Sequence, residues 1–173
     1  MTLSDGIGII AKKADTPATE RKVITMTAKE HLQNWVNADY DTLMSEGMNA
    51  FFRLKPYMDA FADEQTDTDK EQDDCAAVTF AIIIARAVIA DRQITETEAR
   101  FIKALFRFEE EEMILCHEVS ASDDHKVFNM FVDFLDREGK FALLDLITSI
   151  FACDETVKAD EQRLLLDILA RIG

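Results

Sequence analysis

Glycine and proline are scarce in this chain, with five and two of them among 173 residues. An all-β protein needs many tight turns, which draw on glycine and proline, so the composition argues against that class. No stretch shows the sustained alternation of apolar and polar residues that is typical of a half-buried strand. Hydrophobic residues make up 48% of the chain, enough for a sizeable core in one domain.

Basic residues are also in short supply: 19 Lys and Arg stand against 34 Asp and Glu, for a net charge of -15. This balance repels phosphate backbones, and the chain has no basic run, so we expect no binding to nucleic acid. An acidic surface suits metal cations, a protein partner with a basic surface, or simple solubility.

Cysteines are few, odd in number and widely separated, at Cys75, Cys116 and Cys153. This pattern fits reduced, buried thiols better than a disulfide framework, so we expect a cytoplasmic protein. No secretory signal is visible, and the longest apolar run, 76–90, contains Arg86 and is too short to span a bilayer. The chain has no Gly-rich phosphate loop and no nucleophile motif, so we do not expect an enzyme.

Apolar residues recur at helical spacing along most of the chain, which predicts an all-α protein. Residues 1–26 look like an N-terminal lead-in, interrupted by Pro17, and 27–173 form the predicted domain. We expect a compact single-domain bundle of about seven to eight helices. The acidic stretch 63–74 is predicted to be a loop that links two helices. Gly139 is predicted to end a helix.

One acidic motif occurs twice, each time between two apolar helical segments. Its first copy runs from Asp91 to Glu98 and its second from Asp154 to Glu161. Both read Asp-x-x-(Ile/Val)-x-x-x-Glu. Apolar positions before and after the motif also coincide between the copies, which indicates an internal duplication of a helix-loop-helix unit, about 75–108 and 138–171.

The four motif carboxylates, Asp91, Glu98, Asp154 and Glu161, have two interpretations. If they converge, their hard oxygen atoms suit calcium, magnesium or manganese. Alternatively they stabilise the loops without a metal, since Thr95 and Glu98 have the spacing of a capping box. In the second copy Lys158 replaces the threonine, so only half of that capping box can form.

A buried helix that ends in Ala-Asp, followed by an aliphatic residue and a Glu at these spacings, resembles the motif of the tellurite resistance TerB-like family. Ala90, Asp91, Ile94 and Glu98 match it. In the second copy Asp154, Val157 and Glu161 match, while Cys153 takes the Ala position. The chain departs from the family pattern where Arg92 and Glu155 occupy its usual Gly position.

The resemblance covers about 75–173. It implies a compact helical fold, an acidic cluster that binds metal ions, and a role in resistance to tellurite and other chemical stress. Similar domains also occur in J-domain cochaperones, so the fold alone fixes no activity. Two functions therefore stay open: a stress protein with divalent cations at the paired acidic loops, and a metal-free interaction module for a protein partner.

Overall fold

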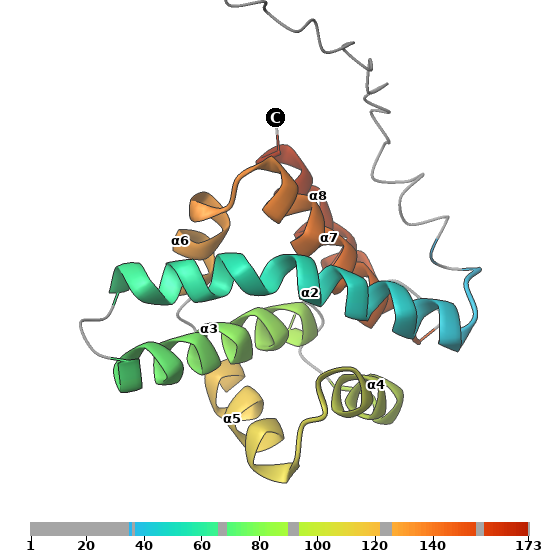
Figure 1. Cartoon of the computed structure of the whole chain (residues 1–173). Helices are drawn as coiled ribbons and strands as arrows, with labels where there is room; N and C mark the ends of the chain where they lie inside the picture. The colour runs from blue at the N-terminus through green and yellow to red at the C-terminus, as the bar shows by residue number, and fades with distance from the viewer. Residues whose placement is uncertain are drawn as a thin grey trace, which may run out of the picture.

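The computed structural model describes residues 35, 37–65, 69–89, 94–121, 126–154 and 158–172. All regular structure in these ranges is α-helical, so the predicted all-α class is confirmed. The predicted lead-in, 1–26, lies outside them. The helices are α2 (Tyr40–Gln65), α3 (Asp69–Ile89), α4 (Glu96–Phe106), α5 (Glu110–Ala121), α6 (Lys126–Phe134), α7 (Arg137–Ala152) and α8 (Ala159–Ala170) (Figure 1).

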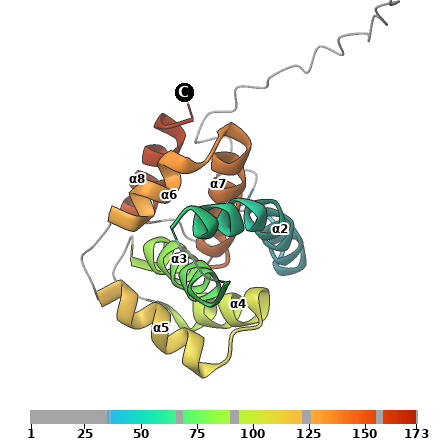
Figure 2. The same cartoon turned by 60° about the vertical axis from the view of Figure 1, so that its left-hand side comes forward.

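Helix α2 is the longest of these elements and runs across both α3 and α7, as two views show (Figures 1 and 2). Among the described residues, its contact with α7 is the most extensive between any two helices. Arg53 of α2 forms an ion pair with Asp145 of α7. The Tyr57 hydroxyl donates a hydrogen bond of 2.7 Å to Asp136, which caps the N-terminus of α7.

The core lies where α2, α3 and α7 meet. From Ala142 to Ala152 every residue of α7 is buried except Asp145, the partner of Arg53. Helix α3 is buried from Thr79 to Val88 except at Ile82 and Arg86. Two helices that are apolar on nearly all sides must lie centrally, since only neighbouring helices can cover them.

The two predicted repeat units correspond to α3 with α4 and to α7 with α8. Their surroundings differ, because α7 packs against α8, the helix that follows it, whereas α3 packs mainly against α5; α2 contacts both α3 and α7. Within the described residues, no helix is long and apolar enough to cross a membrane.

Residues 63–74 were predicted to form a loop, and that prediction was wrong for most of the segment. Helix α2 continues to Gln65 and α3 already begins at Asp69. Polar residues do not prevent a helix, since Glu, Gln and Lys have good intrinsic helix propensity. Pro56 also lies inside α2 and does not end it.

The prediction for Gly139 was wrong as well, since Gly139 lies in the first turn of α7. Its backbone N–H donates a hydrogen bond of 2.8 Å to Asp136, the N-cap residue. A Cβ at this position would lie 2.9 Å from Leu135. Glycine is therefore used here for close approach at a helix start and not for a left-handed helix end.

Candidate functional site

The first acidic loop closes onto α4 through a complete capping box, as predicted. The Thr95 hydroxyl accepts a hydrogen bond of 3.1 Å from the N–H of Glu98. In return the Glu98 carboxylate accepts one of 2.7 Å from the N–H of Thr95. Two backbone donors at the start of α4, which the helix itself leaves without acceptors, are thereby satisfied.

The second loop keeps half of this arrangement. The Glu161 carboxylate accepts a hydrogen bond of 2.7 Å from the N–H of Lys158, the N-cap residue of α8. Lys158 makes no side-chain cap bond, because an ammonium group has no acceptor to offer. The predicted loss of half the capping box is confirmed.

The two loops meet directly. The Thr95 hydroxyl, from the first loop, donates a hydrogen bond of 3.0 Å to the Asp154 carboxylate of the second. One hydroxyl therefore caps α4 and joins the two copies of the motif. We call the group formed by Thr95, Glu98, Cys153, Asp154 and Glu161 the acidic joint.

The acidic joint is largely closed to solvent. Glu98 and Glu161 are 1% and 2% exposed, and Cys153 and Asp154 are half-buried. Burying a carboxylate is costly unless hydrogen bonds or opposite charges compensate for it. The backbone N–H groups of Thr95 and Lys158 supply part of that compensation.

The pKa of the Cys153 thiol is affected by three carboxylates of the acidic joint. Burial, together with the negative charges of Asp154, Glu98 and Glu161, raises its pKa to about 12. Three of the four predicted site residues thus act on one sulfur atom. The fourth, Asp91, lies outside the described residues.

A metal ion needs several ligand atoms directed at one point, and this is not what the described residues provide. Among them, no group of three or more His, Cys, Asp or Glu side chains is arranged to hold a metal ion. Glu98 and Glu161 each direct a carboxylate oxygen at their own helix start. Without Asp91, the acidic joint does not fit a chelating site.

Cys153 is the member of the acidic joint that sequence reasoning missed as a site residue. Its only signal was its place in the motif, where it substitutes for alanine directly before Asp154. All three cysteines are free thiols, and Cys116 is buried. Burial and the nearby charge of Glu112 raise the Cys116 pKa to about 11.

Comparison of the chain with protein-family models, with curated proteins and with solved structures finds no match.

Proposed function

We propose that the protein is a TerB-like helical module of the tellurite and chemical-stress resistance type, and that it works in the cytoplasm by binding a protein partner. The proposal rests first on the geometry of the acidic joint. Its carboxylates serve as helix caps and as a link between the loops, uses that need no metal. The joint then acts as the rigid centre of a scaffold.

The net charge of the chain supports the choice of a basic partner. A net charge of -15 favours a partner with a basic surface and speeds its association at low salt. Long-range attraction of this kind weakens as salt shortens the screening length to about 8 Å at physiological ionic strength.

Calorimetric titration with a lysine-rich peptide tests this function, with a glutamate-rich peptide of equal length as the control. We expect binding that weakens steeply with salt and is unaffected by a chelator of divalent cations. Equal affinity for the two peptides would contradict the proposal. The stress role is tested by expressing the protein in a tellurite-sensitive bacterium, where unchanged growth on tellurite would count against it.

Divalent-cation binding at the acidic joint is the second candidate. One observation favours it: the Thr95–Asp154 hydrogen bond brings the two acidic loops together, and the negative charges of Asp154, Glu98 and Glu161 add to burial in raising the Cys153 pKa. A hard cation such as calcium, magnesium or manganese would offset that charge. Asp91 is the remaining acidic residue of the motif that could complete a ligand set.

Two measurements test cation binding. The first is calorimetric titration of the protein and of the Asp91→Ala, Asp154→Ala double variant with each cation. The second is the alkylation rate of Cys153, which a bound cation would raise by lowering the thiol pKa. If the wild-type protein gives no heat of binding with any of the cations, and if its Cys153 alkylation rate is the same with and without them, this candidate is excluded.

A further inference from the structure

Five phenylalanine rings from α2, α3, α4 and the turn after α4 form one continuous cluster. Phe51 contacts Phe52, Phe80 and Phe106, with ring centroids 5.8, 5.1 and 5.4 Å apart. Phe80 contacts Phe106 at 4.5 Å, and Phe108 lies 5.4 Å from each of these two rings. We call the four rings of this cluster that reach solvent, Phe51, Phe52, Phe106 and Phe108, the aromatic face.

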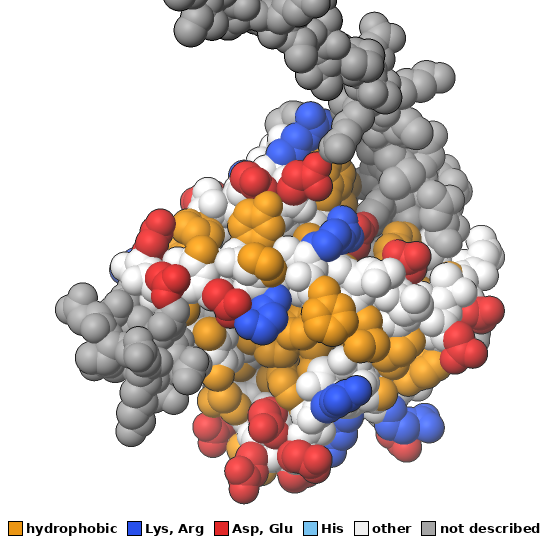
Figure 3. Space-filling model, in the orientation of Figure 1, with side chains coloured by type: hydrophobic (Ala, Val, Ile, Leu, Met, Phe, Trp, Pro, Cys, Tyr) orange, Lys and Arg blue, Asp and Glu red, His pale blue; other side chains and the backbone are white. Residues whose placement is uncertain are grey.

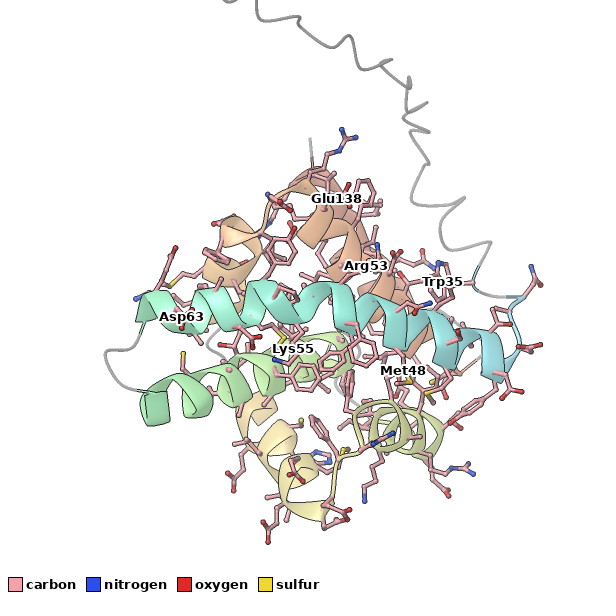
Figure 4. All side chains as sticks on the ribbon, in the orientation of Figure 1. Trp35, Met48, Arg53, Lys55, Asp63 and Glu138 are labelled. Carbon is pink, nitrogen blue, oxygen red and sulfur yellow. The ribbon has the colours of Figure 1, made fainter. Side chains whose placement is uncertain are left out.

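The aromatic face is open to solvent, and only the base of the cluster is covered. Phe80 is 9% exposed, whereas Phe52 is 59% exposed, and the other three rings are half-buried. In the space-filling view, hydrophobic side chains gather over α2, α3 and α4 (Figure 3). Met48 and Lys55 of α2 lie on the side of the helix toward α3 and α4 (Figure 4). Contiguous exposed apolar surface of this kind marks interaction sites.

The start of α5 places carboxylates beside the aromatic face. Phe108 is followed directly by four exposed glutamates, which we call the acidic rim: Glu109, Glu110, Glu111 and Glu112. The Glu112 carboxylate accepts a hydrogen bond of 2.9 Å from the N–H of Glu109 and therefore lies next to the residue that follows Phe108. The Glu110 carboxylate lies 2.7 Å from the Lys103 Nζ, which holds the start of α5 against α4. In Figure 3, Asp and Glu side chains gather over this end of α5, at the lower edge of the molecule.

Positive charges at the border of the aromatic face offset the acidic rim only in part. Lys103 pairs with Glu110, and Lys55 pairs with Asp59, each at 2.7 Å. Arg107, the exposed C-cap of α4, takes part in none of the ion pairs among the described residues, and neither do the other three carboxylates of the acidic rim. Three carboxylates therefore stand against one guanidinium, so the border is negative like the chain as a whole.

We propose that the aromatic face and the acidic rim together bind a basic amphipathic helix of a partner protein. Apolar side chains of that helix cover Phe52 and its neighbours, and Lys or Arg side chains at its edge pair with the acidic rim. An amphipathic helix lays its apolar side on a hydrophobic surface in this way, and aromatic side chains often dominate the affinity. The inference rests on the proposed function and deepens it, because it names the surface that receives the basic partner and the form that the partner takes.

The test uses a fluorescent helical peptide with leucine on one face and lysine on the other. One control peptide carries glutamate in place of every lysine, and a second has the same composition as the first peptide but leucine on all sides of the helix. Fluorescence anisotropy is recorded against the full chain. We expect the amphipathic lysine peptide to bind more tightly than either control. Phe52→Ala, which truncates a largely exposed ring, should weaken its binding about tenfold.

Two double variants separate the acidic rim from the net charge of the chain. Glu109→Gln with Glu111→Gln removes two carboxylates of the rim and leaves the Glu112 cap and the Lys103–Glu110 pair intact. We expect it to weaken binding of the amphipathic lysine peptide about fivefold at low salt. Glu64→Gln with Glu138→Gln is the control. It changes the net charge equally, but at exposed positions near the end of α2 and the start of α7, and should leave affinity nearly unchanged.

Leu166→Ala is the control for Phe52→Ala. Leu166 is 54% exposed on α8 and outside the aromatic face, so we expect its truncation to leave the affinity unchanged.

Three results would overturn the proposal. The first is equal affinity for the amphipathic lysine peptide and either control peptide. The second is an equal effect of the two double variants, which would mean that the net charge acts without a local surface. The third is a wild-type dimer in sedimentation that Phe52→Ala dissociates, which would assign the aromatic face to a second copy of the chain.

This proposal and the proposed function can be told apart when one of them fails. The lysine-rich peptide that tests the function carries no apolar face, so its salt-dependent binding does not require Phe52. If that peptide binds while Phe52→Ala leaves the affinity for the amphipathic lysine peptide unchanged, the function stands and the docking surface is wrong. If neither lysine-containing peptide binds, both proposals fail.

Discussion

The Thr95 hydroxyl and the Asp154 carboxylate are 3.0 Å apart although 59 positions separate them in the sequence. The same hydroxyl accepts the N–H of Glu98. A single oxygen atom therefore serves both the start of α4 and the contact between the two acidic loops, and its removal should affect both.

We expect Thr95→Val to lower the free energy of unfolding by about 2 kcal/mol, because it removes a cap and leaves Asp154 without this donor. Asp154→Ala and the double variant complete a mutant cycle, with an expected coupling of about 1 kcal/mol. Urea denaturation measures all four proteins. Thr97→Val, two positions further along in the first turn of α4, is the control, and zero coupling would show that the hydrogen bond contributes nothing.

Lys158→Thr should rebuild in the second loop the capping box that the first loop has. The Glu161 carboxylate already accepts the N–H of residue 158, so only the hydroxyl acceptor is missing. We expect a stability gain of about 1 kcal/mol over Lys158→Ala, measured by thermal unfolding. Equal melting temperatures for the two variants would mean that the loop cannot adopt the geometry of the first copy.

Cys153 and Cys116 should resist alkylation by iodoacetamide at neutral pH, because their pKa values of about 12 and about 11 leave very little thiolate. Asp154→Asn should raise the rate at Cys153 by removing a negative charge that favours the protonated thiol. Cys116 serves as the internal control in the same sample. Mass spectrometry of the modified peptides gives both rates, and a parallel rise at both cysteines would indicate general loosening instead.

The Tyr57–Asp136 hydrogen bond should make stability depend on pH at both extremes. Hydrogen bonds from the Gly139 N–H and the Tyr57 hydroxyl lower the Asp136 pKa below its ordinary 3.8, so its contribution is lost as pH falls through that lowered value. The bond to Asp136 raises the Tyr57 pKa above 10.0, so its contribution is lost as pH rises through that raised value.

Comparison of wild type with Tyr57→Phe tests this pair. The difference in unfolding free energy should be greatest near neutral pH, and should shrink below about pH 4 and above about pH 10. Tyr40→Phe is the control, since Tyr40 is exposed and packs its ring edge-on against Phe101. A difference that stays constant with pH would show that the hydroxyl contributes only through packing.

Gly47→Ala should destabilise the protein, although alanine ordinarily improves the interior of a helix by about 1 kcal/mol. A Cβ at Gly47 would lie 2.7 Å from the Ser149 Oγ and 3.2 Å from Leu105. Overpacking of this kind costs about 1–3 kcal/mol. Adding Ser149→Ala should recover part of the loss in chemical denaturation, and no recovery would place the clash elsewhere.

Local patterns predicted much of this structure because they reflect local physics. The Thr95–Glu98 capping box depends on spacing alone, and the recurrence of apolar residues at helical spacing was sufficient to predict an all-α chain. Prediction failed where one residue type has two structural uses. A glycine such as Gly139 can end one helix or allow close packing in the first turn of the next. Acidic residues between 63 and 74 suggested solvent exposure but did not exclude helix.

The contacts that define the acidic joint and the phenylalanine cluster around Phe51 could not be predicted in this way. The Thr95–Asp154 bond and the cluster around Phe51 both depend on how distant helices pack. Tyr57 and Asp136 are 79 positions apart, and no pattern in either segment indicates the other.

The position of α2 has a consequence for the order of assembly. Its neighbour α3 follows at once in the chain, but Asp145, the partner of Arg53, is 92 positions away. During synthesis on the ribosome, α2 and α3 therefore emerge one after the other. The surface of α2 that contacts α7 remains exposed to solvent until α7 has been synthesised, when most of the chain is complete. Contacts of such long sequence separation slow folding. We therefore expect the surface of α2 that contacts α7 to be the part of the nascent chain that is most exposed to chaperones and to aggregation.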